Sequence, residues 1–395
     1  MTQRSDDVSE LVQRAEKLQP LLAAHAARTD TTRRPATEAL AAITEAGLLK
    51  LGTPRRFGGY QSPLRTQVEV SAALGQGCGS TAWIVQNMNG SAVFAGMLPE
   101  KAQNEVWADS PDARVVAAMG PLTEVTRVEG GFRVSGKVGW LSGVDYADWA
   151  MVGFATPEYE QHPPGVVMGL VPVEPARIED TWQVTGMRGT CTNTLHLDQV
   201  HVPDHRTMNV LGLLAGLSPT EFQDEALYRG TQFSLTLAII LAGTQIGLAQ
   251  AAAELVRAKA PTRPISYTTY GSQAQSVGFQ IQLGQAEVMI DSATRYLLDI
   301  AERIDEAGRQ GRQLPLHRRL MLRAGLSWAC TQLREAVGLL VDAHGTSSFA
   351  EANPLQRIWR DINTASRHAM LNAQVGFEAH GAGALGAPTT IIPTA

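Results

Sequence analysis

The chain has 395 residues, of which 44% are hydrophobic and 18% charged, which is ordinary for a globular protein of two or three domains. A formal net charge of −5 without basic runs gives no reason to expect a nucleic-acid or membrane-surface partner. The three cysteines are well separated, which argues against a disulfide framework, and the polar N-terminus argues against a signal peptide. No apolar run is long enough to span a bilayer, which argues against a membrane protein. Together these features favour a cytoplasmic location.

Helical spacing dominates the first part of the chain. Apolar residues recur every three or four positions from Val8 to Leu22 within a predicted helix at 7–28, and Pro35 and Gly47 mark the start and end of the next helix. Further helices are predicted at 63–76, at 80–97 and, more briefly, at 99–109. Residues 1–112 are therefore expected to form an α-domain.

The pattern changes after Asp112 to short segments rich in β-branched residues and separated by turn residues. These segments are ARVVAAM, FRVSGKVGW, WAMVGFA, GVVMGLVPV and TLHLDQVHV. No helix of useful length lies between them, so an antiparallel sheet pair or barrel is expected in a central domain at 113–210.

Helical spacing then returns and continues almost to the end of the chain. The predicted helices lie at 222–259, 274–308, 315–344 and 354–378, which indicates a C-terminal four-helix bundle at 220–380. Residues 381–395 are expected to form a flexible tail, and the GAGALG sequence in it follows a helix rather than a strand, which argues against a nucleotide-binding loop. The predicted fold class is α+β with several domains.

The stretch GKVGWLSGVDYADW at 136–149 combines residues that suit a planar heterocycle. The ring of Trp140 can cover a face, the hydroxyl of Ser142 can bond an edge atom, and Gly143 lets the backbone come close. The alternative is a tryptophan buried in a β-core and followed by a turn, and the pattern alone favours that alternative.

The order of helices, strands and bundle resembles the acyl-CoA dehydrogenase fold. Within that superfamily the chain is similar to the flavin-dependent monooxygenases that receive reduced flavin from a separate reductase. Four stretches carry the resemblance: GCGSTAW (77–83), GKVGWLSGVDYADW (136–149), WQVTGMRGTCTNTLHLDQVHVP (182–203) and HGTSSFAEANPLQRIWRDINTASRH (344–368).

The resemblance implies a cofactor, partners and an assembly. Reduced FMN or FAD would come from a separate flavin reductase, and dioxygen would add to it as a C4a-hydroperoxyflavin that oxygenates a small organic substrate. The expected reaction is hydroxylation of an aromatic or polyketide compound, or N-oxygenation of an amine. The resemblance also implies a homotetramer.

The resemblance further implies where the flavin lies. Trp140 would lie against the isoalloxazine, and the Ser142 hydroxyl would bond N5. The backbone on the neighbouring strand at Ala118, Met119 and Gly120 would contact the ring. Arg263 is similar to an arginine that reaches the flavin phosphates of a partner subunit, although its spacing fits poorly and a surface arginine is an equal alternative.

The resemblance separates oxygenation from dehydrogenation at one position. The acyl-CoA dehydrogenases use a glutamate to remove a proton from a thioester, and its place falls here at Ala369, which cannot accept a proton. Neighbouring His368 instead matches a histidine of the monooxygenases, where it would deprotonate the substrate or hold the terminal oxygen of the flavin peroxide. An acyl-CoA dehydrogenase or oxidase and a non-catalytic helical scaffold remain the alternatives.

The substrate-binding residues are expected around the STAW element, because relatives line their pocket there. Trp83, Asn87, Asn89 and His368 are the candidates, although several relatives carry a histidine where this chain has amides. No metal is expected. The three histidines at positions 196, 201 and 205 lack the spacing of a ligand set, because residues five apart on a strand face opposite sides.

Overall fold

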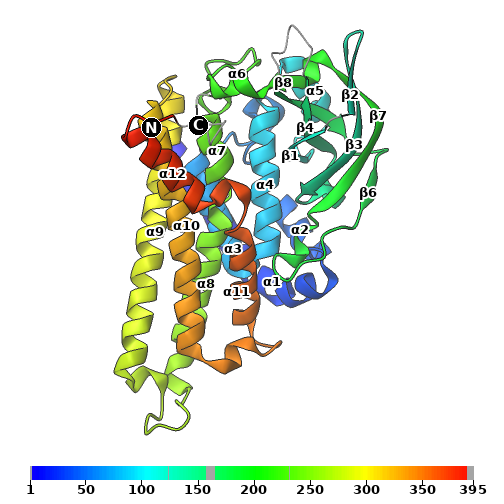
Figure 1. Ribbon diagram of the computed structural model, residues 1–395. Helices are drawn as coiled ribbons and strands as arrows, with labels where there is room; N and C mark the ends of the chain where they lie inside the picture. Colours follow the sequence, from blue (N-terminus) through cyan, green and yellow to red (C-terminus); the bar gives the residue numbers. More distant parts are fainter. Residues whose placement is uncertain (1, 123, 157–164, 231, 389–395) are drawn as a thin grey trace.

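In a computed structural model, which describes residues 2–122, 124–156, 165–230 and 232–388, the chain forms helices, then strands, then helices again. Figure 1 shows the long helices on one side, the strands on the other, and helix α4 between them. The first five helices lie close to their predicted positions. They are α1 (Thr2–Thr32), α2 (Thr37–Glu45), α3 (Leu64–Gly77), α4 (Gly79–Ala95) and α5 (Glu100–Trp107).

Two four-stranded sheets follow. The first has the order β1-β4-β5-β8 and the second the order β2-β3-β7-β6. The strands are β1 (Val115–Leu122), β2 (Glu124–Val128), β3 (Gly131–Leu141), β4 (Trp149–Ala155), β5 (Val166–Pro172), β6 (Arg177–Glu179), β7 (Asn193–Pro203) and β8 (Thr207–Asn209).

One strand pair differs from the predicted antiparallel arrangement. Strands β1 and β4 pair in parallel, from Val115 opposite Trp149 onwards. The chain crosses into the second sheet for β2 and β3 before it returns to the first sheet as β4, so β4 runs in the same direction as β1. All other pairs between the described strands are antiparallel.

The first predicted helix of the bundle is wrong before Phe233. Before Phe233 the chain forms the short helix α6 (Val210–Leu214) and turns. The rest of the predicted helix is divided into α7 (Phe233–Ile239) and α8 (Gly243–Lys259). The turns at 215–230 are held by bonds between side chains and backbone carbonyls, such as that from Arg229 to Gly308 on α9. Such bonds satisfy the backbone without a helix. The long helices α9 (Val277–Arg309) and α10 (Leu316–His344) lie where the sequence predicts them.

The last predicted helix is two helices. Helix α11 (Pro354–Ala365) ends before a turn, and α12 (Ala373–Ala384) begins after it and extends into the segment predicted as tail. The side chain of His368 accepts the backbone N–H of Met370 in the turn, and that of Asn372 accepts N–H groups in the first turn of α12, so each begins a new element. Part of the predicted tail, 389–395, lies outside the described residues.

Close helix contacts hold the bundle against the N-terminal helices. A Cβ on Gly247 would lie 2.1 Å from the carbonyl oxygen of Ala72 on α3, so α8 and α3 can only pack this closely because the residue is glycine. The segment Phe233–Thr262 is long and apolar enough to cross a membrane, but 89% of its most apolar window is buried in the protein. Its apolar side chains therefore form the core of the bundle.

Candidate active site

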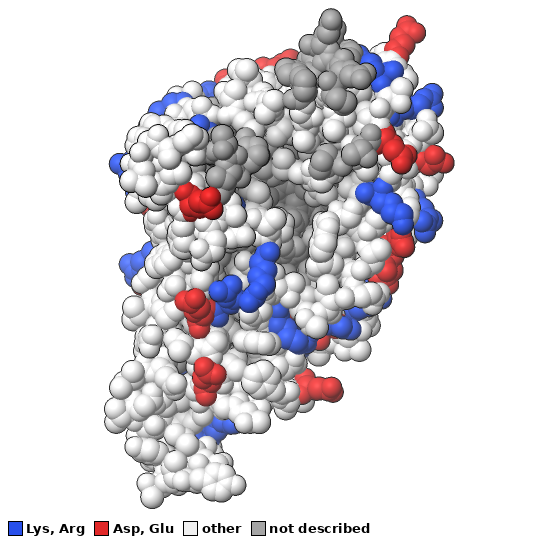
Figure 2. Space-filling model, viewed as in Figure 1, with Lys and Arg blue, Asp and Glu red and all other residues white. Residues whose placement is uncertain are grey.

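A cavity of about 800 Å³ opens between α4, the first strands and the turn after α11. On the face drawn in Figure 2 the surface is hollowed between the helical bundle and the strands. The volume lies within the range of roughly 300–1,000 Å³ typical of small-molecule sites. Among the described residues that line the cavity there is no aspartate or glutamate. Glu378, the carboxylate that would have favoured a dehydrogenase, is exposed on α12 and does not line it.

Trp140 stands at the cavity wall in a strained conformation. Its backbone φ is 64°, which a non-glycine residue rarely adopts, and its side chain is 75% exposed. The cause is an irregularity near the end of β3, where the pairing with β7 shifts between Val138 and Leu141. The Trp182 ring contacts the Trp140 ring edge-on at 5.6 Å. The Trp140 indole therefore has the Trp182 ring as a neighbour and leaves most of its surface open.

Ser142 lines the cavity and belongs to a chain of contacts between hydroxyl groups. Its Oγ accepts a hydrogen bond from Nε1 of Trp83 at 3.1 Å and lies 2.9 Å from Oγ1 of Thr192. Thr192 lies 2.7 Å from Oγ1 of Thr190, which donates to the carbonyl oxygen of Met187 at 2.9 Å. All three hydroxyl side chains line the cavity.

The loop that carries these threonines is wedged between three helices. A Cβ on Gly186 would lie 2.1 Å from the carbonyl oxygen of Arg360 on α11, and one on Gly189 would lie 2.3 Å from Thr29 on α1. Only glycine fits either place. The MRGT segment can therefore approach the cavity between α1, α4 and α11.

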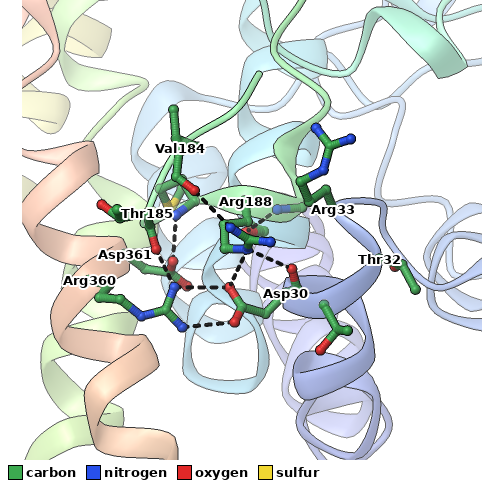
Figure 3. Close-up of polar contacts among 12 residues, drawn as sticks. Asp30, Thr32, Arg33, Val184, Thr185, Arg188, Arg360 and Asp361 are labelled. Atoms are coloured by element: carbon green, nitrogen blue, oxygen red, sulfur yellow. Dashed lines mark hydrogen bonds and ion pairs between the residues drawn. The ribbon is translucent and has the colours of Figure 1, made fainter. Parts of the chain in front are cut away.

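Charged groups anchor the same loop. Figure 3 shows Arg188 and Arg360 converging on Asp30 from the loop and from α11. Arg360 also donates to the carbonyl oxygen of Thr185, and Arg188 donates to that of Val184. These contacts tie α1, the loop and α11 together.

The peptide of Met187 is held on both sides. The carboxylate of Asp361 accepts its N–H at 2.5 Å, and its carbonyl accepts from Nε1 of Trp182 at 2.8 Å as well as from Thr190. Met187 itself has a φ of 55°. Fixed donors and acceptors thus hold a left-handed turn in a single position.

The backbone of β1 bulges toward the cavity at the residues predicted to contact a ring. Ala118 pairs with Val152 and Leu122 with Phe154, so three residues of β1 lie opposite Gly153 alone. The carbonyl oxygen of Met119 would lie 2.7 Å from a Cβ at Gly153, so the bulge requires this glycine. Ala118, Met119 and Gly120 all line the cavity.

His368 faces the cavity from the turn after α11. Its Nδ1 accepts the backbone N–H of Met370 at 3.2 Å, so the neutral ring carries its hydrogen on Nε2. The residue is partly open to the cavity, but neighbouring protein atoms desolvate the ring, and this desolvation, together with the charge of Arg323, lowers the pKa of His368 to about 4. The side chain is therefore a neutral hydrogen-bond donor at pH 7. Its ring lies 6.1 Å from that of Trp83.

Much of the cavity lining is apolar. Trp83 and Asn87 of α4 line it, as predicted, and the Asn87 amide nitrogen donates to the backbone of its own helix. Six methionines also line it: Met119, Met151, Met168, Met187, Met208 and Met370. Flexible, polarisable thioethers suit an aromatic ligand.

Three predicted site residues lie outside the cavity lining. The Asn89 amide is buried and fully used by the backbone of residues 48–52 and of Val85, so its predicted role in substrate binding is wrong. The N–H of Gly143 donates to the carbonyls of Thr190 and Cys191, and its Cα packs on α4, so this glycine serves packing. Arg263 lies in the connection between α8 and α9, and Figure 1 shows this connection at the end of the bundle away from the strands.

The sequence alone did not identify Thr190 and Thr192. They belong to the TCT portion of the third resemblance stretch, but no periodic pattern distinguishes them from other loop threonines. Their positions depend on Gly186 and Gly189, whose contacts lie on other helices. Among the three histidines at 196, 201 and 205, His196 bonds Glu179 and His205 bonds Glu105, and the described residues contain no group of three or more potential ligands.

Relatives of known type match nearly the whole chain. The family described as acyl-CoA dehydrogenase, C-terminal domain, matches residues 239–373. The oxygenase component of an FADH(2)-dependent resorcinol hydroxylase from Rhizobium sp. is 30% identical over 371 residues, covering 92% of this chain and 90% of that protein. The oxygenase subunit HsaA from Rhodococcus jostii is 28% identical over 384 residues, covering 96% and 99%.

A solved structure agrees with these relatives. XiaF from Streptomyces sp., in complex with FADH2 and glycerol, superposes with a TM-score of 0.91 at 34% identity, covering 98% of both chains. These matches confirm the predicted fold and the monooxygenase interpretation over the dehydrogenase and scaffold alternatives. The chain belongs to the two-component flavin-dependent monooxygenases, the oxygenase components built on the acyl-CoA dehydrogenase fold.

Proposed function

We propose that this protein hydroxylates a small aromatic molecule with dioxygen and with reduced FMN or FAD delivered by a separate flavin reductase. One oxygen atom enters the substrate and the other leaves as water. The observation that carries the proposal is the composition of the cavity, which brings together Trp140, Ser142 and His368 and, among the described lining residues, holds no carboxylate. The described part of the lining therefore offers no carboxylate base for thioester chemistry.

The residues present fit a reduced flavin. The open face of Trp140, the bulged backbone at 118–120 and the hydroxyl of Ser142 offer a flat ring a stacking surface, backbone polar groups and an edge contact. Reduced flavin, when bound, supplies the electrons that activate dioxygen. The methionines and Trp83 exclude water around the ring, which protects activated oxygen from being discharged as hydrogen peroxide.

His368 has a specific part in this proposal. A neutral ring whose Nδ1 is already an acceptor presents Nε2–H to the cavity. We assign it to donate a hydrogen bond to a substrate oxygen or to the oxygen being transferred, rather than to remove a proton. This narrows the two roles that the resemblance implies for this histidine.

An aromatic substrate is supported by the relatives and by the lining. The relatives include hydroxylases named for resorcinol and for p-hydroxyphenylacetate. Methionine sulfur makes favourable contacts with aromatic rings, and six methionines surround this cavity. We propose further that the protein is a cytoplasmic homotetramer in which Arg263 reaches the flavin phosphates of a neighbouring subunit.

The test measures coupling, which is the amount of hydroxylated product formed per reduced flavin oxidised. Ser142→Ala, supplied with reduced flavin and a panel of phenols and indoles, should form less product and more hydrogen peroxide per flavin oxidised. Thr194→Val is the matched control, because Thr194 pairs with the Thr181 hydroxyl and does not line the cavity. Unchanged coupling in Ser142→Ala would remove this residue from the proposal. Reduction of oxidised flavin by a thioester without a reductase would overturn the reaction type.

A further inference from the structure

We infer that a buried row of hydroxyl groups fixes the direction of the Ser142 hydrogen bond and so makes the site favour reduced over oxidised flavin. The row consists of Thr190, Thr192 and Ser142 and is called here the hydroxyl relay. The inference rests on the proposed contact between Ser142 and the flavin. It assigns Thr190 and Thr192 as positioning residues for that contact.

The direction of the relay is set at a backbone carbonyl. The oxygen of Met187 can only accept, so the 2.9 Å contact with Thr190 uses the single hydroxyl proton of Thr190. The 2.7 Å contact between Thr190 and Thr192 must then use the proton of Thr192. By the same count, the 2.9 Å contact between Thr192 and Ser142 uses the proton of Ser142.

Ser142 is therefore an acceptor toward the cavity. It gives its own proton to Thr192 and accepts one from Trp83 at 3.1 Å, which leaves one lone pair. N5 of reduced flavin carries a hydrogen and matches this lone pair. N5 of oxidised flavin is itself an acceptor, so two lone pairs would face each other.

Reversing the relay has a cost. For Ser142 to donate to oxidised flavin, all three hydroxyls must turn, and the oxygen of Thr190 would face that of Met187 with no proton between them. Met187 cannot retreat, because Asp361 holds its N–H and Trp182 donates to its carbonyl. Losing one buried hydrogen bond corresponds to a preference for reduced flavin of roughly tenfold.

The experiment compares affinities for the two redox states. Dissociation constants of oxidised FMN and FAD, and of the same flavins reduced under anaerobic conditions, are measured for the wild type, Thr190→Val and Thr192→Val. In Thr190→Val, Thr192 can turn its proton toward Ser142, so Ser142 can donate into the cavity. In Thr192→Val, Ser142 loses its protein acceptor. The ratio of oxidised to reduced dissociation constants should fall about tenfold in both, equivalent to a two-electron potential of the bound flavin lower by about 30 mV.

Three controls separate the possible outcomes. Thr190→Ser keeps the hydroxyl and should keep the wild-type ratio, and Thr194→Val removes a hydroxyl pair outside the relay and should also keep it. If both valine variants fold and keep the wild-type ratio while Ser142→Ala loses affinity for reduced flavin, the relay is refuted and the Ser142 contact survives. If Ser142→Ala binds reduced flavin as tightly as the wild type, the contact and the relay both fail.

Discussion

Asp361 should make the protein less stable as the pH rises, and its replacement by asparagine should remove this effect. The carboxyl is 3% exposed and accepts the N–H of Met187. Burial raises its pKa from 3.8 to about 7, and the charge of nearby Asp30 acts in the same direction, against the hydrogen bond from Met187 and the arginines Arg360 and Arg357. Asparagine has the same shape and keeps an acceptor for Met187.

The sign and size follow from the two pKa values. The folded protein binds this proton more tightly than the unfolded chain, so the stabilisation is complete below pH 3.8 and is lost as the pH rises toward 7. The cost to folding is about 2 kcal/mol at pH 5 and about 4 kcal/mol at pH 8. The stability of Asp361→Asn relative to wild type should therefore improve by about 2–3 kcal/mol over this range.

Urea unfolding of both proteins at pH 5 and pH 8, followed by circular dichroism, measures this difference. Asp198→Asn, an exposed position on β7, controls for the amide substitution itself. A difference between Asp361→Asn and wild type that stays constant with pH, or that moves in favour of the wild type at pH 8, would refute the reasoning. In that case the buried carboxyl would not be the proton-binding group that its surroundings indicate.

Three further predictions concern the cavity and the loop. His368→Ala should lower product formation roughly 10²-fold, and His368→Asn should lower it less because asparagine keeps an N–H donor. Because desolvation lowers the pKa of His368 to about 4, the fraction of oxidised flavin that yields product in the wild type should show no ionisation near pH 6.5. Equal losses in the two variants, or such an ionisation, would contradict the donor role. Trp140→Ala should weaken reduced-flavin binding about tenfold in an anaerobic titration, whereas Trp328→Ala, an exposed tryptophan on α10, should not. Gly186→Ala should lower the stability of the protein in thermal unfolding by about 1–3 kcal/mol, because the added Cβ would meet the Arg360 carbonyl. Gly338→Ala, which has open space around its Cβ, should stabilise the protein slightly. Equal effects of the two substitutions would mean that the loop can move.

Local patterns in the sequence were sufficient to predict most elements. Apolar residues at helical spacing predicted α3, α4, α9 and α10 close to their observed ends. Helix α9 buries one apolar face along its length, whereas α4 is buried on nearly all sides. Alternating and β-branched segments likewise predicted β1, β3, β4, β5 and β7. The resemblance to the acyl-CoA dehydrogenases also implied oxygenation rather than dehydrogenation, because the chain has Ala369 where those enzymes have a glutamate.

Contacts between distant residues decided the rest. The predicted helix at 354–378 breaks where His368 and Asn372 accept backbone N–H groups, and this break turns His368 toward the cavity. Asn89 looked like a pocket amide, but the backbone of 48–52 takes up its hydrogen bonds. No periodic pattern records such pairings, because each partner comes from a different part of the chain.

The direction of the hydroxyl relay illustrates the same division. The sequence by itself determined that a serine lies two residues after Trp140 and that two threonines lie about fifty residues later. Only the tertiary structure placed Thr190 and Thr192 between Ser142 and a backbone carbonyl. The physical reason is that a hydroxyl can donate or accept, and only its neighbours in space choose which.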